Sequence, residues 1–282
     1  MSTPLNRSDL PSVAVLGAGK MGEILAVGIL RAALAPPLQV HLSDINRSRV
    51  ADLVGKHGFS SETTNADAVD KADVILLSVK PQDIGAVLDE IAPRVRSEHV
   101  VISIAAGITT RSIEAKLPAS TAVVRAMPNA AAAVGEGVTA ICGGSSATEE
   151  HLALAERLLG GVGGVLRVAE GYIDAVTAIS GSGPAYVALF AEAIIDAGVT
   201  VGLSRPIATE LALRTVSGTA AMMSKGGMAP AAVREAVTSP GGTTAMALAE
   251  LERAGVRAAV LNAVQAAAER ARALSGEGRT ER

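Results

Sequence analysis

Aromatic residues are almost absent from this 282-residue chain, which has no tryptophan, two tyrosines and two phenylalanines. Proteins that bind single-stranded nucleic acid stack bases on aromatic side chains, so the scarcity of rings argues against that class. Basic residues do not dominate either, because 25 lysines and arginines face 28 aspartates and glutamates, and no basic block occurs. The sequence therefore predicts no nucleic-acid partner.

Cysteine and long apolar runs are equally scarce. The single cysteine, Cys142, has no partner for an intramolecular disulfide, which fits a reducing compartment. Residues 1–11 are polar and lack the apolar core of a signal peptide. No uninterrupted run approaches the roughly 20 apolar residues of a membrane-spanning helix. We therefore expect a cytoplasmic protein with no membrane partner.

Metal-binding and nucleophile motifs are missing as well. The scattered histidines have no metal-ligand spacing with one another or with the cysteine: His41, His57, His99 and His151. No G-x-S-x-G elbow is present. We expect no metal, histidines that serve as surface or packing residues, and Cys142 as a small apolar filler. Asp174 is interpreted as a capping or surface charge.

Apolar residues are abundant, at 49% of the chain against 19% charged residues, which is enough for a sizeable core. Up to about Gly171, short runs of valine, isoleucine and leucine alternate with helical segments. Strands are predicted at 12–17, 39–44, 73–79, 99–104, 121–126, 139–141 and 165–168, and helices at 20–34, 46–57 and 148–159. Near-continuous apolar strands separated by helices indicate an α/β protein with a mostly parallel, doubly wound sheet.

Beyond about Gly171 the strand-like runs stop and alanine-rich segments take over. Apolar residues recur at helical spacing over 185–197, 205–223, 229–237, 243–254 and 257–274. We place a domain boundary there, with an α/β domain over 1–171 and an all-α domain over 172–282. Small side chains let helices approach closely, but each buries little area. We therefore expect the helical domain to gain stability from a second subunit, the alternative being a compact monomeric bundle.

Three glycines form the pattern G-x-G-x-x-G directly after the first predicted strand and at the start of a helix: Gly17, Gly19 and Gly22. In that context the first permits a tight turn, the second lets a pyrophosphate approach the backbone, and the third allows helix and strand to pack closely. The helix N-terminus offers N–H groups and a positive dipole end to phosphates. The pattern predicts dinucleotide binding, against the alternative of a glycine-rich turn without a ligand.

The end of the second predicted strand is where such proteins contact the adenosine ribose. Asp44 lies there, and a carboxylate at this point accepts hydrogen bonds from both ribose hydroxyls, which favours NAD. Arg47 and Arg49 follow, and either can pair with the 2′-phosphate of NADP. The residues of this segment leave both cofactors open.

Further motifs follow the ends of later strands, where open α/β sheets bind ligands: 78–81 (SVKP), 103–108 (SIAAGI) and 124–129 (VRAMPN). Two more lie in the helical part: 178–186 (AISGSGPAY) and 238–244 (TSPGGTT). In this order, behind the glycine-rich turn, the motifs resemble those of the pyrroline-5-carboxylate reductase family. The resemblance extends from about Val13 to Leu274.

The resemblance implies a Rossmann-type domain followed by an all-α dimerisation domain, and hydride transfer from NAD(P)H to Δ1-pyrroline-5-carboxylate, which yields L-proline. It implies a preference for NADPH with NADH accepted, although Asp44 departs from the small and basic residues common in NADP-preferring relatives. It implies a homodimer, with a pentamer of dimers as the larger assembly found in the family. The cofactor-binding residues are then expected to be Leu16, Gly17, Ala18, Gly19, Lys20, Met21, Gly22, Asp44, Arg47, Asn65, Ser78, Val79, Lys80, Pro81, Ile104, Ala105, Ala106, Met127, Pro128 and Asn129.

The substrate carries one carboxylate and a ring nitrogen, and two glycine-rich segments suit it. Each is expected to be a loop that exposes backbone N–H groups at a helix N-terminus, a natural carboxylate site. In the first, serines suit capping and proline suits the first helical position. The expected substrate-binding residues are Ser180, Gly181, Ser182, Gly183, Pro184, Ser239, Gly241, Gly242, Thr243 and Thr244.

The resemblance points to Thr244 as the partner of the imine nitrogen and the catalytic residue. A threonine hydroxyl is not acidic enough to protonate an imine, so we expect it to orient and polarise the nitrogen. Holding hydride donor and acceptor in register would supply much of the rate.

Two alternatives remain. A β-hydroxyacid-type dehydrogenase needs a base, commonly a lysine, on the first interdomain helix, and residues 173–196 contain neither lysine nor histidine. A non-catalytic dinucleotide sensor would keep the three glycines but needs neither of the two motifs in the helical part.

Overall fold

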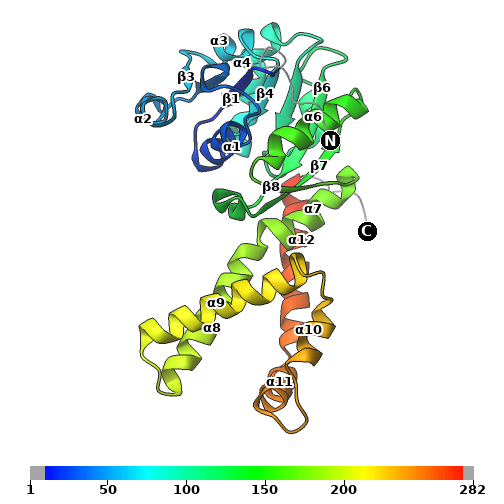
Figure 1. Cartoon of the computed structure of the whole chain (residues 1–282). Coiled ribbons are helices and arrows are strands. Elements are labelled where there is room, and N and C mark those ends of the chain that lie inside the picture. The colour runs from blue at the N-terminus through cyan, green and yellow to red at the C-terminus, as the bar shows by residue number, and fades with distance from the viewer. Residues whose placement is uncertain (1–9, 276–282) are drawn as a thin grey trace. The chain divides into compact units, whose positions relative to one another are not determined.

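The structure is a computed structural model that describes residues 10–275, so most of the polar segment 1–11 lies outside the described residues. Two compact units make up the chain, whose elements are labelled in Figure 1. The first unit contains the residues up to Gly181 and those from Ala267 onward, and the second contains Ser182–Ala266.

An eight-stranded sheet forms the first unit, in the order β3-β2-β1-β4-β5-β6-β7-β8. Every neighbouring pair is parallel except β6 with β7. The strand order turns back between β1 and β4, which confirms the predicted doubly wound, mostly parallel sheet. The strands are β1 (Val13–Leu16), β2 (Val40–Ser43), β3 (Ser60–Ser61), β4 (Val74–Leu77), β5 (Val100–Ser103), β6 (Ala122–Met127), β7 (Gly137–Gly143) and β8 (Gly163–Arg167).

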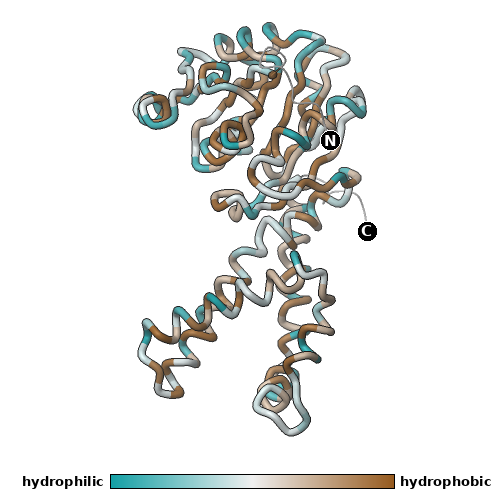
Figure 2. The backbone as a smooth tube through the Cα atoms, viewed as in Figure 1, coloured by the Kyte–Doolittle hydropathy of each residue, from teal (hydrophilic) through white to brown (hydrophobic). Residues whose placement is uncertain are grey.

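Helices cover both faces of this sheet because successive strand residues point to opposite sides. Val13 and Val15 of β1 join one apolar cluster, whereas Ala14 and Leu16 join the other. Helices α1, α2 and α6 pack into the first cluster and α3, α4 and α5 into the second. The apolar strands stand out in brown in Figure 2.

The helices of the first unit are α1 (Lys20–Arg31), α2 (Arg47–His57), α3 (Asn65–Asp70), α4 (Ile84–Ile91), α5 (Thr110–Glu114), α6 (Glu149–Gly160) and α7 (Ile173–Val176). Short 3₁₀ turns are η2 (Pro37–Gln39), η3 (Pro81–Asp83), η4 (Ala92–Arg94), η5 (Ala130–Val134) and η6 (Glu170–Tyr172), and η7 (Thr177–Gly181) is a π-helical turn.

The second unit is helical, as the alanine-rich segments predicted. Its helices are α8 (Gly183–Thr200), α9 (Arg205–Ser224), α10 (Pro230–Ala236), α11 (Thr243–Arg253) and α12 (Val256–Ser275), the last of which ends in the first unit. Prolines occupy the first turn of α8, α9 and α10, where the missing N–H is tolerated. Helices α8 and α9 approach closely, since a Cβ on Gly198 would lie 3.0 Å from Ala208 Cβ.

Large apolar side chains remain exposed on these helices. On α8, Leu189 is 67% and Phe190 49% exposed, and on α9 Leu211 and Leu213 are each more than half exposed. One helical segment, Glu170–Thr200, is long and apolar enough to cross a membrane by length and composition. The sequence analysis did not predict it, because polar residues interrupt its apolar run. Length and composition alone are weak evidence for a membrane span. Exposed apolar side chains such as those of α8 and α9 are also typical of a surface that a protein partner buries.

Candidate functional site

The carboxyl ends of the parallel strands carry the predicted cofactor residues. Because β1, β2, β3, β4, β5 and β6 run parallel, these ends meet at one edge of the sheet. From N- to C-terminus, the strands are followed there by the glycine-rich turn, Asp44 and Arg47, Asn65, the segment 78–81, the segment 104–106, and Pro128 with Asn129. Met127 is the last residue of β6 itself. The topology thus brings the predicted cofactor set to a single edge.

The glycine-rich turn can only be built from glycine at two of its three positions. Gly17 has φ +99°, and a Cβ there would lie 2.8 Å from the backbone of Ser78 and Val79. A Cβ on Gly22 would collide with the carbonyl oxygen of Gly17 and lie 2.8 Å from Ser78 Oγ. These two glycines therefore serve the close packing of turn, helix and strand.

Gly19 differs from its neighbours, because a Cβ there would meet nothing within 4 Å. It is the N-cap of α1, and no side chain caps the first turn. The first N–H groups of α1 are therefore left without a capping side chain at the positive end of the helix dipole. This arrangement fits the pyrophosphate of a dinucleotide.

The turn is braced by two side chains that directly follow β2 and β4, the strands on either side of β1. Ser78 Oγ donates a hydrogen bond to the carbonyl of Gly17 at 2.6 Å. Asp44 Oδ2 accepts from the backbone N–H of Ala18 at 2.6 Å, while Oδ1 accepts from Asn46 N at 2.7 Å. Asp44 therefore holds the glycine-rich turn to the start of α2, in addition to any contact with a ribose.

Both arginines beside Asp44 also have protein partners. Arg47 donates to the carbonyls of Glu62, at 2.8 Å, and Thr63. Arg49 pairs with Glu23 on α1 and donates from Nε to the carbonyl of Ala18 at 3.3 Å. Arg49 thus touches the glycine-rich turn itself, whereas Arg47 is directed to the segment after β3.

Two predicted amide side chains hold neighbouring elements. The side-chain amide of Asn65, at the start of α3, donates to Glu90 Oε2 on α4 at 2.7 Å. Asn129 Oδ1 accepts from the backbone N–H of Val138 at 3.1 Å, which ties the segment after β6 to β7.

The first substrate motif is helical and not the expected loop. Residues 177–181 form the π-helical turn η7, and α8 follows from Gly183. Ser182 makes no capping hydrogen bond, and Ser180 Oγ donates to the carbonyl of Val176 at 3.0 Å. The chain stays helical here because Pro184 lies in the first turn of α8, where its missing N–H is not needed. π turns occur preferentially at functional sites.

Within the first unit, Met127 of the cofactor set lies against Gly181 of the substrate set. A Cβ on Gly181 would be 3.0 Å from Met127 Cε, so a larger residue would push the methionine away. The remaining substrate residues, from Ser182 onward, belong to the second unit.

The second substrate motif is a turn that leads into α11, as predicted. Ser239 O accepts from Gly242 N at 3.0 Å, and Gly241 has φ +68°, the conformation that a proline–glycine turn requires at this position. Thr244 lies in the first turn of α11. Its hydroxyl makes no hydrogen bond to another residue in the described part of the chain, so it can serve a ligand.

A buried ionic cluster beneath Met127 was missed by the sequence analysis. Arg125 on β6 is 3% exposed, and its guanidinium lies 3.2 Å from Glu170 Oε1 and 3.9 Å from Asp174 Oδ1. Asp174 is 8% exposed, so its interpretation as a capping or surface charge was wrong. The sequence contains one indication of this cluster, which is the arginine between Val124 and Ala126 in an apolar strand. A charge buried in such a strand needs a partner of opposite charge.

The cluster has a definite charge state. Burial pushes the pKa of Glu170 up, but hydrogen bonds from Thr110 and the charge of Arg125 outweigh it and hold that pKa below its ordinary value. Burial, reinforced by Glu170, raises the pKa of the Cys142 thiol to about 11, so the thiol stays neutral and unreactive. Cys142 therefore acts as the apolar filler that was predicted.

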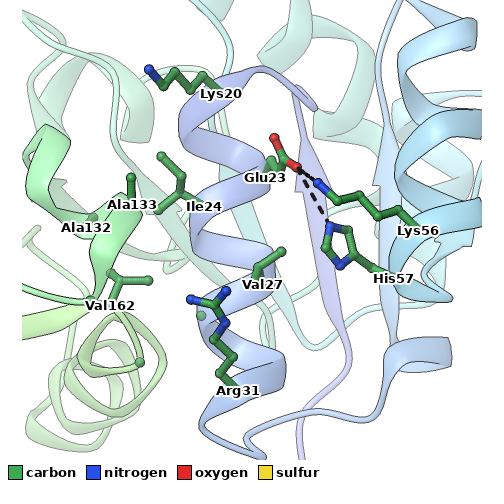
Figure 3. Close-up of a pocket in the computed structure, with 13 residues that line it drawn as sticks. Lys20, Glu23, Ile24, Val27, Arg31, Lys56, His57, Ala132, Ala133 and Val162 are labelled. Carbon is green, nitrogen blue, oxygen red and sulfur yellow. Dashed lines mark ion pairs between the residues drawn. The ribbon is translucent and has the colours of Figure 1, made fainter.

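A hollow of about 280 Å³ opens beside α1 (Figure 3). Among its lining residues, Lys20 alone belongs to the predicted cofactor set. Glu23 pairs there with Lys56, 3.5 Å from Nζ, and approaches His57. The hollow therefore lies next to the phosphate turn and is not the site of the chemistry.

Comparisons with known proteins agree with this geometry. Residues 170–274 match the family model described as pyrroline-5-carboxylate reductase dimerisation, and residues 12–107 match the model described as NADP oxidoreductase, coenzyme F420-dependent. A pyrroline-5-carboxylate reductase from Mycobacterium tuberculosis is 45% identical, covering 93% of this chain and 96% of the relative.

Solved structures give the same result. A pyrroline-5-carboxylate reductase from Coxiella burnetii superimposes with a TM-score of 0.89 at 33% identity, over 95% of this chain and 99% of that one. The pyrroline carboxylate reductase from Plasmodium falciparum, with NADP bound, gives 0.82 at 32% identity, over 94% and 98%. On this combination of fold, motif order and identity over nearly the whole length, the chain belongs to the pyrroline-5-carboxylate reductase family.

Proposed function

We propose that the protein reduces Δ1-pyrroline-5-carboxylate to L-proline with NAD(P)H, the last step of proline biosynthesis. The observation that carries this function is the turn of Gly17, Gly19 and Gly22, in which Gly17 and Gly22 are tightly packed and Gly19 has space beside it for a pyrophosphate. It occurs in a chain that is 45% identical to a reductase of this name over 93% of its length.

The cofactor supplies a hydride when bound. The uncapped first turn of α1 would hold its pyrophosphate, and the segments after β2, β4, β5 and β6 would line its path along the sheet edge. For NADPH, the 2′-phosphate would need a cation near Asp44, and Arg47 and Arg49 are the candidates. We propose NADPH as the preferred donor, with NADH accepted.

In the substrate, the hydride adds to the imine carbon while a proton goes to the ring nitrogen, so that the C=N bond becomes CH–NH. Backbone N–H groups of the turn Ser239–Gly242 and the start of α11 would bind the carboxylate. The hydroxyl of Thr244 would hydrogen-bond the nitrogen and orient it, while the proton comes from water or arrives with the substrate.

The division of labour follows the predicted domains. Residues 1–171 would bind the cofactor, and residues 172–282 would bind substrate and form the subunit interface, as a homodimer or a pentamer of dimers. The match of 170–274 to a dimerisation model and the exposed apolar side chains of α8 and α9 support an oligomer. We place the enzyme in the cytoplasm.

The test is oxidation of NADPH, followed by absorbance, with and without pyrroline-5-carboxylate, and then repeated with NADH. We expect substrate-dependent oxidation, with kcat/KM higher for NADPH. A folded protein that binds NADPH but oxidises neither cofactor would overturn the function.

Thr244→Ala tests the role of the hydroxyl. We expect an unchanged Kd for NADPH and a kcat about 10- to 100-fold lower, because a hydrogen bond to the reacting nitrogen is lost. Thr215→Ala, which removes the hydroxyl of an exposed helical threonine on α9 outside both substrate motifs, is the control. Turnover of Thr244→Ala at the wild-type rate would remove Thr244 from the mechanism.

A further inference from the structure

The cluster around Arg125 joins the end of β6 to the segment that leads out of the first unit. Side chains two residues apart on a strand point to the same face, so Arg125 and Met127 share one face of β6. On β7 the opposing residues are Cys142 and Ala140. This face of the β6–β7 pair therefore carries the arginine and the methionine side by side.

Two layers of contacts fix the segment η6–α7 to this face. The ionic layer is Arg125 with Glu170 and Asp174, at 3.2 and 3.9 Å. The apolar layer comprises Ala140, Cys142 and Ile173, which are buried together, with Met127 and Val176 packed against them. Directly beyond Val176, the π turn η7 carries Gly181 to Met127 Cε.

Further hydrogen bonds hold the two carboxylates themselves. Glu170 accepts from Thr110 N at 2.8 Å and from Thr110 Oγ1 at 2.6 Å, so its position is set from α5. Asp174 Oδ2 accepts from Ser275 Oγ at 3.0 Å, so its position is set from the end of α12. Among residues 10–275, Arg125 is the one cation that pairs with both carboxylates, and its two terminal nitrogens are each directed to a different one.

We propose, on the basis of the function proposed above, that Arg125 is a positioning residue that holds the segment 170–181 against Met127. Within the first unit it thereby sets the distance between Met127 of the predicted cofactor set and Gly181 of the first substrate motif. Because Arg125 is only 3% exposed and its charge is directed to Glu170 and Asp174, its role is to act through these two residues and Met127 and not by contact with a ligand. Since an error of about 1 Å in the placement of reacting groups can cost 100-fold in rate, such an anchor affects turnover.

Three variants loosen the anchor to different degrees. Arg125→Lys keeps the positive charge but cannot reach two carboxylates with two nitrogens. Asp174→Asn keeps an acceptor for Ser275 but removes one charge. Thr110→Val leaves all charges in place and removes only the hydroxyl that holds Glu170, so it is the variant to use if the first two fail to fold. The matched control is Arg167→Lys, since Arg167 also bridges two carboxylates, Glu149 and Glu156, but is an exposed residue that pairs with neither Glu170 nor Asp174.

Three measurements are made on each full-length variant: the Kd for NADPH, kcat and KM in the reductase assay, and hydrogen exchange of residues 170–181. We expect an unchanged Kd, a kcat lower by about 10- to 100-fold, and faster exchange confined to 170–181. Arg167→Lys should leave all three at wild-type values.

Folded variants with a lowered Tm but wild-type kcat would overturn the proposal and make the cluster merely stabilising. Unchanged exchange of 170–181 in Arg125→Lys would overturn it independently of activity. A wild-type protein without reductase activity would instead refute the proposed function, while the exchange data would still report on the anchor.

Discussion

At the scale of single residues, the glycine-rich turn gives a sharp test. In Gly22→Ala the new methyl group meets the Gly17 carbonyl and Ser78 Oγ, so the start of α1 must shift away from β4. We expect the free energy of unfolding to fall by about 1–3 kcal/mol and the Kd for NADPH to rise, because the phosphate turn is displaced. Urea denaturation and a fluorescence titration with NADPH measure the two effects.

Gly55→Ala is the control for that substitution. Gly55 also lies in a helix, α2, but a Cβ there meets nothing within 4 Å. This variant should be stabilised by up to about 1 kcal/mol, since alanine is the better helix former. If both variants behaved alike, close packing at Gly22 would not be the cause.

Residue-scale electrostatics predict a loss of stability in mild acid. Burial, reinforced by the charge of Arg96, holds the pKa of His99 below the ordinary histidine value of 6.5. The native state therefore keeps His99 neutral where the unfolded chain binds a proton. Stability from this group is complete above pH 6.5 and is lost as the pH falls from there towards the folded pKa, by at most about 1.4 kcal/mol per pH unit.

Urea midpoints of the wild type and His99→Gln between about pH 7.5 and 5.5 measure this effect. The wild type should lose more stability than the variant as the pH falls, because the remaining ionisable groups are common to both. Parallel profiles would show that His99 does not titrate differently in the two states.

At the scale of elements, the capping of α3 controls a predicted cofactor residue. Thr64 Oγ1 accepts from Asp67 N at 3.0 Å, and Asp67 Oδ2 accepts from Thr64 N at 3.1 Å. Thr64→Ala should cost about 1 kcal/mol in stability. It should also weaken NADPH binding, because Asn65 is the first residue of this helix.

Thr63→Ala, at the exposed preceding residue, provides the comparison, since no hydrogen bond from its hydroxyl is found within the described residues. Thermal melts with and without NADPH separate the two effects. An equal loss in both variants would assign the change to helix propensity and not to the cap.

Elements were predictable where burial fixes a continuous pattern. The runs that became β1, β4 and β5 were recognised because both faces of these strands are covered, which requires apolar residues throughout. The strand β3, Ser60–Ser61, was missed because two polar residues in an outermost strand show no apolar or alternating pattern. The π turn η7 was read as a loop because its serine and glycine are the residues of loops as well.

The site was predictable to the extent that topology determines it. Residues after parallel strands share an edge whatever their side chains, so the cofactor set could be located from strand order. The pairing of Arg125 with Glu170 and Asp174 could not be predicted from strand order, because it joins residues far apart in the sequence through tertiary contacts. Asp44 was assigned to the ribose, and its bond to Ala18 N depends on backbone geometry that no motif encodes.

At the scale of the whole molecule, the apolar surface of the second unit predicts assembly. Leu213 on α9 is 51% exposed, and Leu38 on the first unit is 75% exposed. Leu213→Glu should shift the protein towards monomer and lower its Tm, because a buried subunit interface rejects an unpaired charge. Leu38→Glu should change neither the oligomeric state nor the Tm. Sedimentation of both variants measures their oligomeric state. A fully assembled Leu213→Glu protein would show that the subunit interface lies elsewhere.

The path of the chain through its two units has a consequence for synthesis on the ribosome. The polypeptide leaves the first unit at Gly181 and returns at Ala267, so the second unit is an insertion in the first. Ser275, whose hydroxyl holds Asp174, is the last of the described residues to be synthesised. A nascent chain can form the sheet early, but the anchor beneath Met127 is complete only once Ser275 has been made. Shortening the chain before Ser275 is therefore expected to leave an ordered sheet with a loosened site.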